Sequence, residues 1–202
     1  MSNHYHTDID KFDFSYLKNT RYGKVCEVLE EAKVSHKKDK NTCCVKLRFA
    51  LEIIISEILQ IMGLEKRPKI IANLALIRDH LPEELRSYQG EDILSEMHNV
   101  RKNGNGGAHY DDTNCTDMSK AAYTSFIAMK KICKWVSCFE EKYKKYVEEE
   151  RRKFEEERKR KEDDDRRNRE QIKDVLMKLG KGALAIAAGA LVYVLSNGRI
   201  RK

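Results

Sequence analysis

A run of charged residues from Glu140 to Asp174 constrains the fold more than any other feature. It has few apolar side chains and therefore little to contribute to a hydrophobic core. Acidic residues repeatedly precede basic residues by four positions, which on a helix places them one turn apart. The run predicts a solvated helical spacer, with a nucleic-acid-binding patch as the alternative. The expected pairs are Glu148/Arg152, Glu149/Lys153, Glu155/Lys159, Glu156/Arg160, Glu157/Lys161 and Glu162/Arg166.

The rest of the chain also favours helices. It has only two prolines and ten glycines, so turn signals are scarce, and no alternation of apolar and polar residues is long enough to indicate a sheet. The spacer has no sustained apolar seam, which argues against a coiled coil. We therefore predict an all-α protein with five segments: a disordered N-terminus (1–11), a helical bundle (12–139), the charged spacer (140–174), a hydrophobic helix (175–197) and a basic tail (198–202).

Within the bundle, residues 43–62 form the most hydrophobic stretch and predict a central helix that ends at Gly63. Asn41 or Thr42 is the expected N-cap, after a polar break over residues 35–40. Later helices are expected to begin at Pro68, after Gly90 and after the Thr116–Asp117 pair. Their apolar positions are Ile70, Ile71, Leu74 and Ile77, then Ile93, Leu94, Met97 and Val100, then Met118, Ala121, Ala122, Phe126, Met129, Ile132, Cys133, Trp135, Val136 and Phe139.

The stretch from Arg101 to His109 is the main candidate for a functional site. Arginine binds phosphate through its planar guanidinium, and histidine exchanges protons near neutral pH. We expect Asn103 to Gly107 to end the preceding helix, because asparagine and glycine tolerate the left-handed conformation. His98 lies one helical turn before Arg101.

On the central helix, Arg48 and Glu52 lie one turn apart. They form either a surface ion pair or part of the wall of the Arg101–His109 site.

The net charge of +7 and the isoelectric point near 9.0 permit binding to nucleic acid or to an anionic membrane. His4 and His6 make at most an incomplete metal site. We expect no signal peptide and a reducing cytoplasm, because the N-terminus lacks an apolar segment and the cysteines show no C-x-x-C pair. The cysteines are Cys26, Cys43, Cys44, Cys115, Cys133 and Cys138.

Residues 183–195 carry no charge and, together with residues 175–179, approach the length of a membrane span. Lys178 and Lys181 interrupt the segment, although lysines can extend toward the interface. The basic tail would have to cross the membrane against the usual preference. We expect residues 175–197 to anchor the chain, with burial in an oligomer as the alternative.

Three blocks in this order resemble one family: Phe12-x-Phe14-x-x-Leu17, then Lys46-Leu47-Arg48-x-x-x-Glu52, then Arg101-x-x-Gly104-Asn105-x-x-Ala108-His109. They are similar to the HEPN-like helical domain that occurs alone or at the N-terminus of type I restriction enzyme R subunits. The resemblance covers residues 12–138 and implies an up-and-down helical bundle that forms a homodimer. The spacing from Arg101 to His109 is longer than in the usual ribonuclease motif of the family and resembles the restriction-associated branch.

The resemblance also implies a metal-independent endoribonuclease of bacterial stress or phage defence, with RNA as a partner and no cofactor. Arg101 and His109 would take the catalytic positions, and Asn103, Asn105, Arg48, Glu52 and His98 would support them. The alternative is a non-catalytic module that binds nucleic acid or an unknown protein partner. In that interpretation Arg101 complements the helix dipole and His109 closes the glycine-rich turn.

Overall fold

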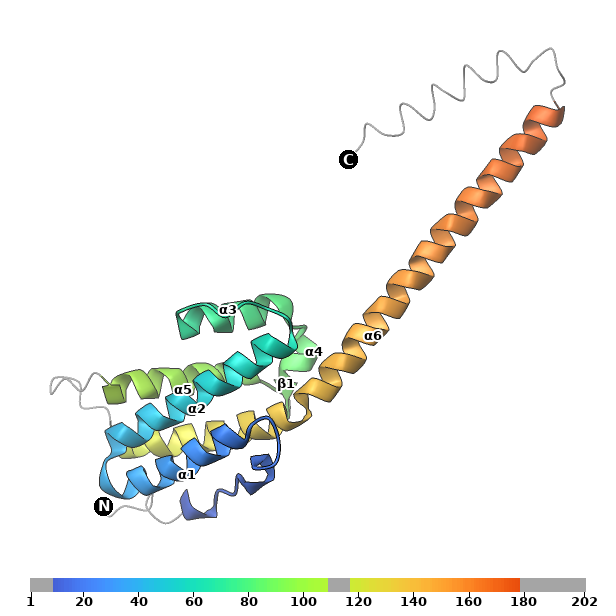
Figure 1. Cartoon of the computed structure of the whole chain (residues 1–202). Helices are drawn as coiled ribbons and strands as arrows, with labels where there is room; N and C mark the ends of the chain where they lie inside the picture. The colour runs from blue at the N-terminus through green and yellow to red at the C-terminus, as the bar shows by residue number, and fades with distance from the viewer. Residues whose placement is uncertain (1–8, 109–116, 179–202) are drawn as a thin grey trace. The chain divides into compact units, whose positions relative to one another are not determined.

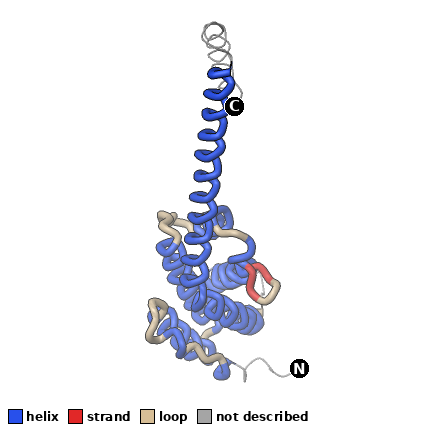
Figure 2. Tube along the Cα trace, turned by 90° about the vertical axis from the view of Figure 1, so that its right-hand side faces the viewer, coloured by secondary structure: helices blue, strands red, loops and turns tan. Residues whose placement is uncertain are grey.

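The computed structural model describes residues 9–108 and 117–178 (Figure 1). The chain divides into two compact units, Met1–Lys145 and Tyr146–Lys202. Helices dominate the described residues of both units (Figure 2), which confirms the all-α prediction. The elements of the first unit are η1 (Ile9–Lys11), η2 (Ser15–Leu17), α1 (Gly23–Lys38), α2 (Lys40–Ile61), α3 (Ile70–His80), α4 (Glu83–Arg86), β1 (Ser87–Tyr88), β2 (Glu91–Asp92), α5 (Ile93–Ala108) and the beginning of α6 (Met118–Lys178).

Helix α2 is the centre of the bundle, as its hydrophobicity predicted, and it packs against α1, α5 and α3. It ends in a Schellman motif, since Leu64 N–H donates to Leu59 C=O at 2.8 Å and Gly63 N–H donates to Gln60 C=O at 3.1 Å. Gly63 has a φ of 69°, a conformation that glycine adopts without steric cost. The predicted end of this helix is therefore confirmed.

The apolar faces expected for α5 and the start of α6 are also confirmed. Ile93, Leu94, Met97 and Val100 of α5 are buried. In α6 the expected apolar positions from Ala121 to Phe139 are buried, while Met118 is half-buried. Asp117 caps α6, because its side chain accepts hydrogen bonds from the N–H groups of Ser119 and Lys120 at 3.0 and 3.1 Å. Thr116 lies outside the described residues.

The predicted break between the first two long helices is wrong in extent. Only Asp39 separates α1 from α2, and residues 35–38 remain helical. Asp39, not Asn41 or Thr42, is the N-cap: its carboxylate accepts from the Asn41 N–H at 2.9 Å and from the Thr42 hydroxyl. Asp39 lies two residues before Asn41, and its carboxylate satisfies a free N–H group at the start of the helix, so it fixes where α2 begins.

The predicted end of α5 at Asn103–Gly107 is also wrong, because the helix continues to Ala108. The glycines instead permit close packing against α2. A Cβ on Gly104 would lie 2.4 Å from Arg48 Cβ, and one on Gly107 would lie 2.8 Å from the Asn41 carbonyl oxygen. Both positions therefore have to be glycine at this backbone separation, although neither is in a turn.

A short hairpin, β1–β2, was not predicted. Ser87 pairs with Asp92 and Tyr88 with Glu91, and the turn residues Gln89 and Gly90 have φ values of 55° and 82°. Strands of two residues are too short to show an alternating pattern in the sequence.

Residues 140–178 are helical throughout, and most side chains from 140 to 177 are exposed, so the prediction of a solvated helix is confirmed. Within this range the ion pairs match the expected ones only in part. Glu157–Lys161 forms at 2.7 Å as predicted, whereas Arg158 pairs with Glu162 at 3.6 Å and Arg152 lies between Glu149 and Glu156. Arg152, Arg158 and Lys161 each have acidic neighbours both three and four residues away, so spacing alone leaves the partner undecided.

None of the helices in the described residues combines the length and apolarity needed to cross a membrane. Most of the proposed anchor, from residue 179 onward, lies outside the described residues, as do His4 and His6. The described cysteines are free: Cys26, Cys43, Cys44 and Cys133 are buried, and Cys138 is exposed.

Candidate functional site

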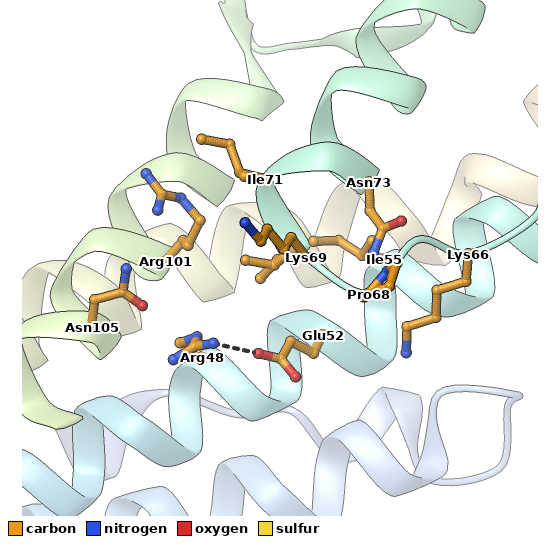
Figure 3. Close-up of a pocket in the computed structure, with 11 residues that line it drawn as sticks. Arg48, Glu52, Ile55, Lys66, Pro68, Lys69, Ile71, Asn73, Arg101 and Asn105 are labelled. Carbon is orange, nitrogen blue, oxygen red and sulfur yellow. Dashed lines mark ion pairs between the residues drawn. The ribbon is translucent and has the colours of Figure 1, made fainter.

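A pocket of about 310 Å³ lies where α2, the 62–69 segment, α3 and α5 meet (Figure 3). Its wall combines cationic, amide and apolar side chains. Arg101 and Asn105 of α5 lie on one side, Lys66 lies on the other, and Lys69 reaches between them. The lining residues are Arg48, Glu52, Ile55, Lys66, Pro68, Lys69, Ile70, Ile71, Asn73, Arg101 and Asn105.

Arg48 and Glu52 line the pocket and also form an ion pair, with Nη2 and Oε1 3.1 Å apart. The pair is therefore both an ion pair and part of the pocket wall, so the two interpretations drawn from the sequence are compatible. The aliphatic part of the Arg48 side chain occupies the space beside Gly104, since any side chain at position 104 would overlap the Arg48 Cβ and Cδ atoms. The stem of Arg48 is thereby held against α5.

Arg101 and Asn105 project from the same face of α5 because they are four residues apart. The Nε atoms of both Arg48 and Arg101 are buried and have no hydrogen-bond partner among the described residues. Buried donors are normally satisfied by protein, water or a ligand. Two such guanidinium groups in one pocket point to a bound anion or ordered water.

Lys66 and Lys69 belong to the site although the sequence interpretation did not include them. Within the described residues neither lysine has a bonded partner. Their segment precedes α3 and is held by Asn73, which is 2% exposed. The Asn73 amide accepts from the Arg67 N–H at 2.6 Å and donates to the Arg67 C=O at 2.9 Å. The signal in the sequence was the basic cluster around Pro68, directly before the third long helix.

Asn103 does not line this pocket. Its amide nitrogen donates to the Ser125 hydroxyl at 2.9 Å and to the Ala121 carbonyl at 3.1 Å, so it joins α5 to α6. Among the described residues its bonds are structural and lie on the face of α5 that meets α6.

His98 is half-buried and also lies outside the pocket lining. Burial, together with the positive charges of Arg101, Lys102 and Arg78, lowers the pKa of His98, while Asp92 acts in the opposite direction. The imidazole is therefore neutral over more of the pH range than an exposed histidine, but it is electrostatically coupled to Arg101.

His109, the proposed proton-transfer residue, lies outside the described residues. The structure thus brings together Arg48, Glu52, Arg101 and Asn105 from the sequence-based candidates, and separates Asn103 and His98 from them.

Four cationic side chains and one carboxylate line the described pocket, giving it a formal charge of +3. Such a site attracts anions, and guanidinium groups suit phosphate in particular.

Among the described residues, no group of three or more histidine, cysteine or carboxylate side chains is arranged to hold a metal ion.

No protein-family model, curated protein or solved structure matches this chain.

Proposed function

We propose that the protein is a HEPN-like effector whose helical unit binds RNA and cleaves it without a metal ion. The observation that carries the proposal is the pair of buried, unpartnered Nε atoms of Arg48 and Arg101 in a pocket of charge +3. A phosphodiester would supply the missing acceptors and offset the charge.

In this mechanism the ribose 2′-oxygen attacks the adjacent phosphorus, and the bond to the 5′-oxygen of the next nucleotide breaks. A general base removes the proton of the 2′-hydroxyl, and a general acid returns a proton to the leaving oxygen. His109 fills one of these roles, and Arg101 stabilises the charge that develops on the phosphate oxygens. DNA lacks the attacking hydroxyl and would not be cleaved.

Incubation of the full-length protein with total RNA in EDTA tests the proposal. Wild type is expected to produce fragments with 2′,3′-cyclic phosphate ends, while His109→Ala and Arg101→Ala leave the RNA intact. Equal cleavage by wild type and His109→Ala would exclude the catalytic role, as would no cleavage by wild type under several buffer conditions.

A second candidate is a module that binds RNA or a protein partner without catalysis. It is favoured by the state of Glu52: among the described lining residues this is the one carboxylate, and it is paired with Arg48. A carboxylate in this contact is placed to hold the Arg48 guanidinium in position for a ligand. RNA binding that depends on Arg101, without cleavage, would support this candidate.

We also propose that the protein is a homodimer, which would bring two sites together. The support is an apolar strip on α2, where Val45 and Phe49 lie one turn apart and are 38% and 51% exposed. Light scattering of Phe49→Glu should give half the mass of wild type. Phe154→Glu, which replaces another exposed phenylalanine, should leave the mass unchanged. A monomeric wild type would refute the dimer.

A further inference from the structure

The cations of the pocket come from two different kinds of structure. Arg48 and Arg101 project from the long helices α2 and α5, whereas Lys66 and Lys69 project from the segment between α2 and α3. Figure 3 shows the helix-borne pair and Lys66 on opposite sides of the pocket, with Lys69 between them. The segment 64–69 is called the lysine arm below.

The lysine arm has a fixed conformation. The Schellman motif at Gly63 determines how it leaves α2. Pro68 restricts its own φ, and the two hydrogen bonds of Asn73 hold both backbone groups of Arg67. Asn73 is buried, so these bonds are shielded from competing water. The two lysines therefore project from a backbone that is already in place before a ligand arrives.

The charge of the pocket exceeds what one phosphodiester can neutralise. Each phosphodiester carries a single negative charge, whereas the lining has a formal charge of +3. Within the described residues Lys66 and Lys69 have no bonded partner, so the positive charge of the arm is uncompensated. Glu65 belongs to the arm but does not line the pocket. The excess charge is matched by a ligand with consecutive phosphates.

We propose that the lysine arm is a second, preformed phosphate contact, so that the pocket binds an RNA strand through at least two consecutive phosphates. Arg48 and Arg101 hold one phosphate, and Lys66 and Lys69 hold its neighbour. Asn73 is a positioning residue that acts through the arm. This inference rests on the proposed function of the same pocket, and it concerns binding, not cleavage.

The test measures binding of the full-length protein to fluorescent 2′-O-methyl oligouridylates that carry from one to six phosphates. The 2′-O-methyl group blocks attack on phosphorus, so binding is measured whether or not the protein cleaves RNA. Wild-type affinity should rise from one phosphate to two or three and then level off. Lys66→Ala/Lys69→Ala should bind the longer strands about tenfold more weakly.

The salt dependence of binding gives a second readout. Each phosphate neutralised on a single strand contributes about 0.7 to the slope of log affinity against log salt. Since Lys66 and Lys69 together hold one phosphate, their loss should reduce the magnitude of this slope by about 0.7. The control Lys18→Ala/Lys38→Ala removes the same charge from exposed sites that do not line the pocket, and it should keep the wild-type slope.

Asn73→Ala separates position from charge. It removes no lysine from the protein, but it removes the two hydrogen bonds to Arg67 that hold the lysine arm in position. It should weaken binding of the longer strands by a larger factor than it weakens binding of the single-phosphate ligand. If this variant fails to fold, the lysine double variant still decides the question, because both of its sites are exposed.

Several results would overturn the inference: no dependence on the number of phosphates, a wild-type slope in the lysine double variant, an equal loss in the Lys18/Lys38 control, or equally tight binding of oligoglutamate. The two proposals fail separately. If binding depends on strand length but no RNA is cleaved, the ribonuclease proposal is wrong and the second phosphate contact stands. If cleavage depends on His109 but the Lys66/Lys69 variant binds RNA as well as wild type, the ribonuclease proposal stands and the second phosphate contact is wrong.

Discussion

Gly104 determines how closely α5 approaches α2. Its missing side chain is the space occupied by the Arg48 stem, since a Cβ there would lie 2.4 Å from Arg48 Cβ and 3.0 Å from the Cys44 carbonyl oxygen. These atoms belong to the backbone or the base of a side chain and cannot move without shifting α2. The same glycine that allows the helices to pack therefore also places Arg48 in the pocket.

We predict that Gly104→Ala destabilises the protein by about 1–3 kcal/mol, because an added methyl group in a packed interface forces the helices apart. Gly106→Ala is the matched control in the same helix: nothing lies within 4 Å of its added Cβ. It should be neutral or stabilise by up to about 1 kcal/mol, as alanine is the better helix former. Urea unfolding followed by circular dichroism measures both. Similar effects of the two substitutions would show that the close approach at Gly104 is not limiting.

His98 gives a prediction with a defined sign. Burial and the nearby charges of Arg101, Lys102 and Arg78 lower its pKa from the ordinary 6.5. The folded state therefore binds a proton less readily than the unfolded state. The contribution of His98 to stability is complete above pH 6.5 and is lost as the pH falls below that value toward the folded-state pKa.

The measurement compares the free energy of unfolding of wild type and His98→Gln between about pH 8 and 5, a range centred on the histidine titration. Wild type should lose more stability on acidification than the variant. Parallel curves for the two proteins would mean that His98 is protonated equally well in the folded and unfolded states.

At the level of elements, the regular parts were predictable from spacing. Apolar periodicity located α2, α3, α5 and the first part of α6, and single signals such as Gly63 and Asp117 marked helix ends correctly. The wrong prediction for the end of α5 has a specific cause. A glycine-rich run can end a helix, or it can remain helical and let another helix pack closely, and the local sequence is the same in both cases. At Gly104 and Gly107 the run serves close packing, because Arg48 and Asn41 of α2 occupy the space that side chains would need.

The candidate site was predictable to the same extent. Spacing placed Arg48, Glu52 and Arg101 on helices. Asn105 was expected in a turn, and it joins them because α5 continues to Ala108. Lys66 and Lys69 were missed because their place depends on the Asn73 amide, which reaches back six residues to Arg67. The contacts of Asn103 could not be predicted from local spacing, because its partners, Ala121 and Ser125, lie in another helix.

The 146–178 part of α6 leads to a prediction for an isolated peptide. The helix is supported by exposed ion pairs such as Glu157–Lys161 and Glu150–Lys153. The hydrogen bond and charge of Lys161 lower the pKa of Glu157, and those of Glu150 raise the pKa of Lys153. The carboxylate contribution is present above pH 4.5 and lost as the pH falls below it; the lysine contribution is present below pH 10.5 and lost as the pH rises further.

Helicity of this peptide, measured by circular dichroism, should be highest near neutral pH and should decrease at about 1 M salt, where the screening length falls to about 3 Å. A control peptide of the same composition, rearranged so that like charges lie four residues apart, should be less helical. Equal helicity of the two peptides would show that intrinsic propensity, and not ion pairing, forms the helix.

For the whole molecule, we predict that residues 175–197 anchor the protein to a membrane. The full-length chain should remain with the membrane pellet after a carbonate wash, whereas a chain ending at Asp174 should be released. The variant Ala187→Arg gives a more specific test, because it keeps the length of the segment and places a charge in its uncharged part. An arginine at the centre of a spanning helix costs about 2.5–3.5 kcal/mol, so this variant should shift to the soluble fraction. If the full-length chain and the shortened chain are both soluble and monodisperse, the segment is buried in protein, and its apolar residues belong to an assembly.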